Sequence, residues 1–316
     1  DNIAAFFVQS RGQGFGVVHH VFTIRGEIRP QGFAKRHRLG GDHMHERSAL
    51  NPRKYAGIDF LAKLLVVAQD QAASGAAQCF VGGRGDNVGK FDRVRVHAGG
   101  NYYSAFLVTS EGIIVIDPID KEAASWLKDE LEQRFDLPVR YLIYSHSDVD
   151  HASGGEIFID AIVIAHENAK AALIRNETPT AIPAITFSKQ MTIELGDGKV
   201  NLVFLGEGHG DSLVALHFPN ERAVLCVDIV WVKRVAYRAV GQAADEPQIS
   251  IPGWIRSLHV LESIDFDILL TSHGAAGTKA DGVEFRQYFE ALYQAVVGAK
   301  RKGLSLEDAQ ASIELN

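Results

Sequence analysis

Cysteine is almost absent from this sequence. Its 316 residues include two cysteines, Cys79 and Cys226. Two thiols cannot build a framework of several disulfides, so the class of small disulfide-stabilised folds is excluded. A structural zinc site made of three or four thiolates is excluded for the same reason. Any metal site in this chain must therefore use histidine and carboxylate ligands.

Long apolar runs are also lacking. No stretch of the sequence approaches the ~18 consecutive apolar residues that a membrane-spanning helix requires. The first residues, DNIAAFFVQSRGQGFG, do not show a basic segment followed by an apolar one, as a secretory leader would. We therefore expect no membrane partner, and a location that is cytoplasmic, or periplasmic if a leader has been removed. The apolar content of 46% and the charged content of 22% are typical of a globular protein.

Charge is unevenly distributed along the chain. Residues 1–98 carry a net charge of +6, whereas residues 99–316 carry −13. The first part also contains 13 of the 30 glycines. This break predicts an N-terminal extension over residues 1–91 and a separate domain over residues 92–316. Within the extension, residues 55–73 have helical periodicity, but no motif decides between an accessory layer, an oligomerisation arm, a poorly ordered segment and a translated region foreign to the domain.

From about residue 91 the hydrophobic pattern changes to short strands separated by helices. Apolar runs predict strands over 91–98, 104–110, 112–118, 138–145, 160–166, 191–206 (a hairpin around 196–198), 212–219, 222–230 and 266–274. Amphipathic spacing predicts helices over 121–135, 166–176, 252–264 and 281–303, the last ending at Gly303. This order favours an α/β fold in which two sheets lie between outer helices.

The stretch YSHSDVDHASGG, residues 144–155, concentrates residue types that bind metals. It holds His146, Asp148, Asp150 and His151, and His146 directly follows a predicted strand. Three more polar residues follow apolar runs in the same way: His209, Asp228 and His273. Side chains at strand ends that point into one opening are a common way for a rigid scaffold to build a site. Imidazole and carboxylate are typical ligands of zinc, and they also suit manganese and iron.

These motifs together resemble those of a known family. HSDVDH, with the following GG, resembles the HxHxDH signature of the metallo-β-lactamase superfamily. GEGHGDS (206–212), LCVDIV (225–230) and TSHG (271–274) resemble its later motifs and occur in the family's order. The resemblance covers about residues 92–316. It implies an αββα sandwich of two mixed sheets with the metals at one edge, which agrees with the fold expected from the hydrophobic pattern.

The resemblance also implies which residues hold the metal. The first site would use His146, residue 148 and His209; the second would use Asp150, His151 and His273; Asp228 would bridge them. We expect one or two zinc ions, with iron or manganese as alternatives. Water held by the metal would attack a carbonyl, and Asp150 would orient that water and pass its proton to the leaving group.

Position 148 departs from the family pattern, which usually has histidine there. Asp148 can bind the first metal directly, because a carboxylate oxygen binds zinc at a distance similar to an imidazole nitrogen. Alternatively the first site is weak and a single metal lies at Asp150, His151, His273 and Asp228, or catalysis has been lost altogether. We favour the first two alternatives, because the other ligand positions are all intact.

The leading functional hypothesis is a metal-dependent hydrolase of an ester, lactone, thioester or β-lactam bond. The alternatives are a mononuclear iron oxygenase of sulfur metabolism, which shares this fold, and a non-catalytic metal-binding scaffold. We expect a small-molecule substrate and no nucleic acid, because the −13 region repels phosphate backbones. The sequence does not specify the oligomeric state. Candidate pocket residues are Trp231, Tyr237, Arg238 and Tyr103, with Tyr102 beside it.

Overall fold

A computed structural model describes residues 90–95, 102–236 and 250–315, with side chains over the second and third of these ranges. The predicted helix over 55–73 and the candidate pocket residues Tyr237 and Arg238 lie outside the described residues. The predicted boundary between residues 91 and 92 therefore stays a prediction. The description that follows concerns the domain that carries the motifs.

The first sheet contains six strands in the order β1-β2-β3-β4-β5-β6. Their bounds are β1 Lys90–Arg95, β2 Tyr103–Thr109, β3 Gly112–Ile116, β4 Val139–Ile143, β5 Ile162–His166 and β6 Ile185–Phe187. The first three strands pair in antiparallel fashion, and β3 to β6 run parallel to one another. The predicted hairpin of residues 104–118 is confirmed as the β2–β3 pair.

The second sheet also contains six strands, in the order β12-β11-β10-β9-β8-β7. Their bounds are β7 Gln190–Leu195, β8 Gly198–Phe204, β9 Val214–Phe218, β10 Ala223–Cys226, β11 Ile268–Thr271 and β12 Gly277–Thr278. The β10–β11 pair is parallel and the other pairs are antiparallel. The predicted hairpin around residues 196–198 is confirmed as the β7–β8 pair.

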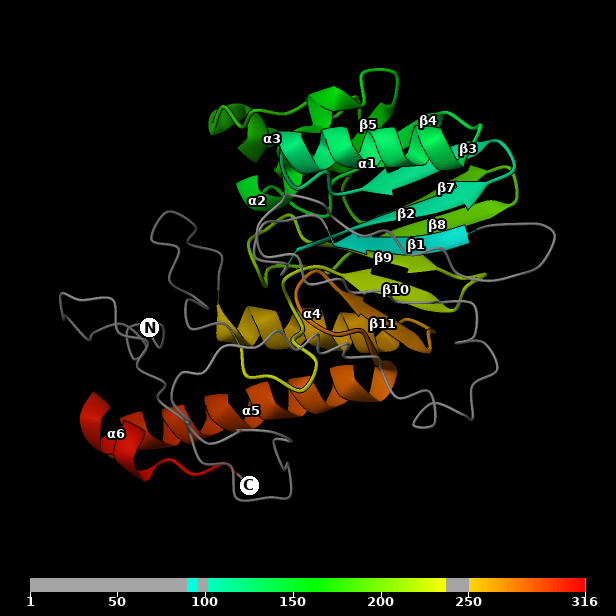
Figure 1. Ribbon diagram of the computed structural model, residues 1–316. Coiled ribbons are helices and arrows are strands. Elements are labelled where there is room, and N and C mark those ends of the chain that lie inside the picture. Colours follow the sequence, from blue (N-terminus) through cyan, green and yellow to red (C-terminus); the bar gives the residue numbers. More distant parts are fainter. Residues whose placement is uncertain (1–89, 96–101, 237–249, 316) are drawn as a thin grey trace, which may run out of the picture.

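Helices cover the outer face of each sheet (Figure 1). Their bounds are α1 Lys121–Arg134, α2 Val149–Ala152, α3 Glu167–Arg175, α4 Ile251–Ser263, α5 Lys279–Arg301 and α6 Leu306–Ser312, with a 3₁₀ turn over Gly155–Ile157. Helix α1 lies against the first sheet, and α4 and α5 lie on the far side of the second sheet. This four-layer order confirms the predicted αββα sandwich.

Three apolar clusters hold the layers together. The cluster between the sheets includes Leu107, Ile114 and Leu216, all fully buried. A second cluster joins the outer face of the first sheet to α1, and a third joins the second sheet to α4 and α5. Strand β3 contributes to both faces of its sheet, and all five of its residues are buried. A strand buried on both faces reads as a continuous apolar run, which explains why GIIVI shows no alternation.

Polar caps define the ends of the long helices. Helix α5 begins at a capping box in which the Thr278 side chain and that of Asp281 each accept from the other residue's backbone N–H. It ends before Gly303, whose φ of 73° lies in the left-handed region that glycine adopts without strain. The predicted C-terminal stop at Gly303 is thereby confirmed. None of the described helices is long and apolar enough to cross a membrane.

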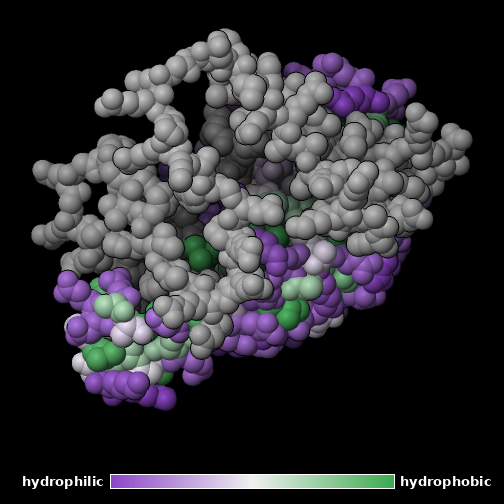
Figure 2. Space-filling view, turned by 60° about the horizontal axis from the view of Figure 1, so that its bottom comes forward, coloured by the Kyte–Doolittle hydropathy of each residue, from purple (hydrophilic) through white to green (hydrophobic). Residues whose placement is uncertain are grey.

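The outer surface of the C-terminal helices is polar. Figure 2 shows the face that α5 and α6 present, where hydrophilic residues predominate and hydrophobic ones form small separate patches. This matches the amphipathic pattern of α5, in which Phe285 and Phe289 are buried against the second sheet and α4, and Val296 is also buried.

Candidate metal centre

Strand ends from both sheets converge on one cluster of histidines and aspartates. His146 follows β4 of the first sheet, while Asp228 and His273 follow the parallel strands β10 and β11 of the second. His209 lies in the loop between β8 and β9. The carboxyl ends of parallel strands face the same edge of a sheet, so residues distant in sequence meet there.

A first group of possible ligands consists of His146, Asp148, His209 and Asp228, whose ligand atoms all lie within 4.8 Å of one another. Asp148 Oδ2 lies 3.0 Å from His209 Nε2 and 3.5 Å from His146 Nε2. Asp148 therefore occupies the middle of this group. Its carboxylate reaches the two histidines with which the sequence had grouped it.

A second group consists of His151, Asp228 and His273. Asp228 Oδ1 lies 2.8 Å from His273 Nε2, and its Oδ2 lies 3.1 Å from His151 Nε2. The same Oδ2 lies 3.6 Å from the ring nitrogens Nε2 of His146 and His209. One carboxylate thus contacts both groups, as the bridging role expected for Asp228 requires.

Asp150 lies outside both groups. Its Oδ2 is 4.0 Å from His151 Nε2 and accepts a hydrogen bond of 2.9 Å from the Tyr102 hydroxyl. Its side chain is 47% exposed, whereas His151 beside it is fully buried. Asp150 therefore lies at the solvent side of the second group.

The donor set fits a cation. Within the described part of the chain, the buried Nε2 atoms of His146 and His151 have no hydrogen-bond partner of good geometry. Unpaired buried polar atoms are costly, and their presence in a native site calls for an ion or another partner. Both point toward carboxylate oxygens at distances of 3.1–3.6 Å. The cluster is therefore suited to a divalent metal, whose identity the donor set leaves open.

The electrostatics of the metal-free cluster agree with this fit. Burial alone would raise the pKa of Asp228, but the imidazoles of His151, His273 and His209 hold it well below its usual range. Burial likewise opposes ionisation of Asp148, and His146 and His209 lower its pKa overall. Both carboxylates are thus charged, and the imidazoles around them stabilise that charge in the absence of metal.

A buried carboxylate that the motifs did not single out supports His146. Asp117 directly follows β3; it accepts the Ser145 backbone N–H at 2.8 Å and the Ser145 hydroxyl at 2.6 Å. Ser145 Oγ lies 2.8 Å from His146 Nδ1. Burial raises the pKa of Asp117, against the attraction of His151 and His146. The signal that identified His146, a polar residue at the end of an apolar strand, also marks Asp117 in GIIVIDP.

Side chains after β11 and on helix α4 support the other ligands. The Ser272 hydroxyl donates to Asp228 Oδ1 at 2.6 Å. The ring of Trp254, on α4, lies edge-on to His209 with centroids 5.6 Å apart. Its indole N–H donates to the Ile229 carbonyl, which fixes the tryptophan. Such outer contacts orient metal ligands and preserve their tautomers.

The backbone at the site is locally strained. Asp117 and Asp228 have φ values of 53° and 54°, a region that non-glycine residues rarely occupy. Gly154, in the turn ASGG (152–155), has φ of 84°, and a Cβ there would lie 2.5 Å from the Asp120 carbonyl. Strained residues of this kind cluster at functional sites, where the surrounding packing holds them.

The candidate pocket residues have different placements. Trp231 is partly buried and stacks on Trp254, with ring centroids 6.0 Å apart, and it also packs near Phe285. Tyr103 begins β2, whereas its neighbour Tyr102 is the tyrosine that reaches Asp150. Roles in substrate binding for Trp231 and Tyr103 stay predictions, as do those for Tyr237 and Arg238 outside the described residues.

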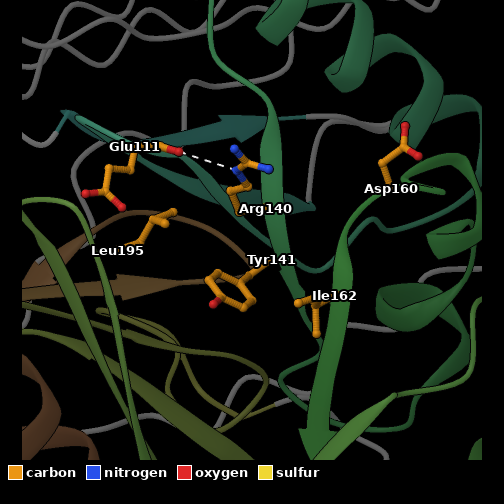
Figure 3. A pocket seen from close by; sticks show the side chains of 6 residues that line it. All are labelled: Glu111, Arg140, Tyr141, Asp160, Ile162 and Leu195. Carbon is orange, nitrogen blue, oxygen red and sulfur yellow. Dashed lines mark hydrogen bonds between the residues drawn. The ribbon is translucent and has the colours of Figure 1, made fainter.

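A cavity of about 480 Å³ opens at the opposite end of the first sheet. Figure 3 shows its lining, which includes Arg140 and Tyr141 at the start of β4 and Ile162 at the start of β5. His146 follows the other end of β4, so this cavity is separated from the ligand groups by the length of the strand. We therefore do not assign it to the metal centre.

Comparison with known families supports the motif assignment. The family model described as "Metallo-beta-lactamase superfamily" matches residues 98–273, which is more than half of the chain. The match begins before β2 and ends at His273, so it includes every predicted ligand.

Individual relatives are more distant. The chain is 25% identical over 203 residues to the 2,4-dinitroanisole O-demethylase subunit alpha of Nocardioides sp. (strain JS1661), which covers 62% of this chain and 60% of that protein. It is 29% identical over 132 residues to the metallo-beta-lactamase type 2 of Elizabethkingia meningoseptica, covering 40% of this chain and 52% of that protein. The chain thus spans little more than half the length of these relatives.

Among solved structures, a metallo-beta-lactamase from Pontibacter korlensis has the same fold. Its TM-score is 0.57 at 18% identity, and the match covers 68% of this chain and 99% of that one. At this identity the likeness concerns the fold alone.

Proposed function

The chain belongs to the metallo-β-lactamase superfamily, and from that premise we propose that it is a metal-dependent hydrolase of an ester, lactone, thioester or β-lactam bond. The observation that carries this proposal is the pair of ligand groups that share Asp228. A divalent metal held there would lower the pKa of a bound water and polarise the bond under attack. We propose zinc as the metal, with iron or manganese as the other candidates.

Each ligand group would hold one metal ion, and Asp150 would transfer the proton. His146, Asp148 and His209 would hold one ion, His151 and His273 a second, and Asp228 both. Asp150, exposed beside the second group, would orient the attacking water, accept its proton and transfer it to the leaving group. The 4.0 Å between Asp150 Oδ2 and His151 Nε2 also allows Asp150 to serve as a further ligand.

Asp148 would be a ligand of the first ion. Its distances of 3.0 Å to His209 and 3.5 Å to His146 support this over the alternative of a vacant first site. The extra carboxylate adds a negative charge, so a water bound to this ion would be less acidic than with a histidine at position 148. We therefore propose that Asp148 tunes the first site without abolishing it.

Two groups with a shared carboxylate favour the hydrolase over the mononuclear iron oxygenase, whose chemistry needs one metal with open positions. They also disfavour the non-catalytic scaffold, since a scaffold has no need for five buried or half-buried ligands around one carboxylate. We propose a small-molecule substrate and no nucleic-acid or membrane partner, in keeping with the charge of −13 over residues 99–316.

A second candidate reaction is the hydrolytic removal of a methyl group from an activated aryl ether. One relative, matched over 62% of this chain, is a 2,4-dinitroanisole O-demethylase subunit. In such a reaction water would displace methanol from the aromatic carbon and leave a phenol. The same activated water would serve, so the two candidates differ in substrate and not in the residues used.

The test combines metal content with a substrate panel. Purified protein, loaded with zinc, iron or manganese, is assayed on an aryl ester, a lactone, a thioester, a β-lactam and 2,4-dinitroanisole. We expect about two ions per chain, loss of hydrolysis in Asp150→Ala and weaker hydrolysis in Asp148→Ala, with Asp148→His retaining two ions. Asp160→Ala, an exposed aspartate at the distant cavity, is the matched control. Full activity in Asp150→Ala, or one iron per chain with oxygen uptake, would refute the proposal.

A further inference from the structure

Tyr102 joins three parts of the metal centre that come from different elements. It precedes β2 in the first sheet, yet its hydroxyl donates to Asp150 Oδ2 on α2 at 2.9 Å. Its ring packs edge-on against His273, after β11 of the second sheet, with centroids 4.5 Å apart. The ring also lies 5.4 Å from that of His151. Tyr102 is therefore in contact with both histidines of the second group and with the carboxylate beside them.

The ring and the hydroxyl have separate consequences. The ring limits the rotation of His151 and His273, and any aromatic residue of similar shape would do the same. The hydroxyl acts only on Asp150, whose side chain is 47% exposed and would otherwise sample several rotamers in water. Its hydrogen bond to Oδ2 therefore selects the rotamer in which that oxygen faces His151.

We propose that Tyr102 is a positioning residue of the second metal group, where its hydroxyl holds the Asp150 carboxylate beside His151, within reach of an ion that this group would bind. This inference rests on the proposed metal-dependent function. Tyr102 contacts His151, His273 and Asp150, whereas the first group is built from His146, Asp148, His209 and Asp228. The hydroxyl should thus affect the two ions unequally, which a general packing role would not do.

The experiment is a titration of metal-free protein with zinc, in competition with a chromophoric chelator. In Tyr102→Phe the ring is kept and only the hydroxyl is lost. We expect the second ion to bind 10- to 100-fold more weakly, on the order found when outer partners of metal ligands are removed. The first ion should bind as in the wild type, and the melting temperature of the metal-free protein should be unchanged. Cobalt, used as a visible-absorption probe, should report altered geometry at the second equivalent only.

Tyr141→Phe is the matched control, because Tyr141 is a half-buried tyrosine at the opposite end of the first sheet. It should leave both affinities unchanged. A second control uses Asp150→Ala, in which the hydroxyl has lost its acceptor. In that background Tyr102→Phe should cause no further loss, since both changes remove the same interaction.

Several results would overturn the inference. If Tyr102→Phe binds each ion as tightly as the wild type does, Tyr102 is only a packing residue. The same conclusion follows if the substitution weakens the binding of both ions by the same factor. A wild-type protein that binds no ion, or a single ion whose affinity Tyr102→Phe leaves unchanged, would remove the second group as a site and the inference with it. A protein that binds two ions in the expected pattern but hydrolyses no substrate would uphold the role of Tyr102 and refute the proposed function alone.

Discussion

Ser145 links the buried carboxylate of Asp117 to the first ligand of the metal centre. Its single hydroxyl proton is donated to Asp117 Oδ2 at 2.6 Å, so its contact of 2.8 Å with His146 Nδ1 requires that Nδ1 carry a proton. In a neutral imidazole this leaves Nε2 unprotonated and free to bind a metal. The Asp117–Ser145 pair thus selects the tautomer of His146 that a metal ligand needs.

This reasoning predicts the effect of Asp117→Asn. The Ser145 backbone N–H donates to Oδ1, so the amide oxygen should occupy that side and the NH₂ the other. The amide would then donate to Ser145 Oγ, the Ser145 proton would turn to His146 Nδ1, and the unfavourable tautomer would be selected. We expect the first metal ion to bind about 10- to 100-fold more weakly, as measured by chelator competition.

Asp197→Asn provides the control for this substitution. Asp197 Oδ1 also accepts a serine backbone N–H, that of Ser110 at 2.7 Å, but at the turn between β7 and β8. Its change to asparagine should leave metal affinity untouched. If Asp117→Asn binds the first ion as tightly as the wild type does, the hydrogen bonds from Asp117 through Ser145 do not determine the tautomer of His146.

At the scale of elements, helix α5 depends on its N-terminal cap. Its 23 residues cover α4 and the second sheet, and Thr278 Oγ1 accepts the Asp281 backbone N–H while Asp281 accepts that of Thr278. Loss of a threonine cap typically costs about 1 kcal/mol. We therefore expect Thr278→Ala to lower the free energy of unfolding by about 1 kcal/mol, measured by urea denaturation.

Thr278→Ser keeps the accepting oxygen and should retain most of this stability. The metal affinity of Thr278→Ala should not change, because the cap contacts none of the ligand groups. A fully stable Thr278→Ala variant would mean that packing of α5 against α4, and not the cap, determines where the helix begins.

The elements differed in how well the sequence predicted them. Strand β3 and helix α5 were predicted because their apolar residues are numerous and regularly spaced over several turns or a complete strand. Strand β6, of three residues, and helix α6, of seven, were missed. Strand β6 is too short to show a pattern of its own, and its strand form comes from pairing with β5.

The same distinction applies to the site. His146, His209, Asp228 and His273 follow strands in motifs with a fixed order, so the sequence could group them. The contact of Tyr102 with Asp150 joins residues 48 positions apart, and no local pattern marks it. At position 148 the sequence and the structure each supply part of the information. The motif shows that aspartate replaces the usual histidine, but its place between His146 and His209 required the structure.

At the scale of the whole molecule, the metal centre joins the two halves of the sandwich. His146 and His151 follow the first sheet, whereas Asp228 and His273 follow the second. A metal bound by both sets would therefore stabilise the packing of one sheet on the other, in addition to the apolar cluster between them. Removal of the metal should then destabilise the entire domain and not a single loop.

The loss of stability on metal removal should depend on pH. His151 is buried and faces the carboxylates of Asp228, Asp117 and Asp150. Burial alone would lower the pKa of His151, but these carboxylates raise it from 6.5 to about 9. Because the pKa is higher in the folded state, protonated His151 stabilises the metal-free fold below pH 6.5, and this contribution is lost as the pH rises toward about 9. His209, which donates to Asp148, has a raised pKa as well, despite its burial.

We therefore expect chelated and zinc-loaded protein to diverge as the pH rises from about 6.5 to about 9. The melting temperature of the chelated protein should fall across this interval, because unprotonated histidines no longer balance the carboxylates. That of the loaded protein should fall less, since metal ligands must be deprotonated and binding strengthens with pH. Thermal denaturation of both forms at several pH values measures the difference between their melting temperatures, here called the gap.

His259→Gln, which removes a surface histidine paired with Glu290, should leave the gap unchanged. A gap that stays constant with pH would show that imidazolium groups do not occupy the place of the cation in the metal-free protein.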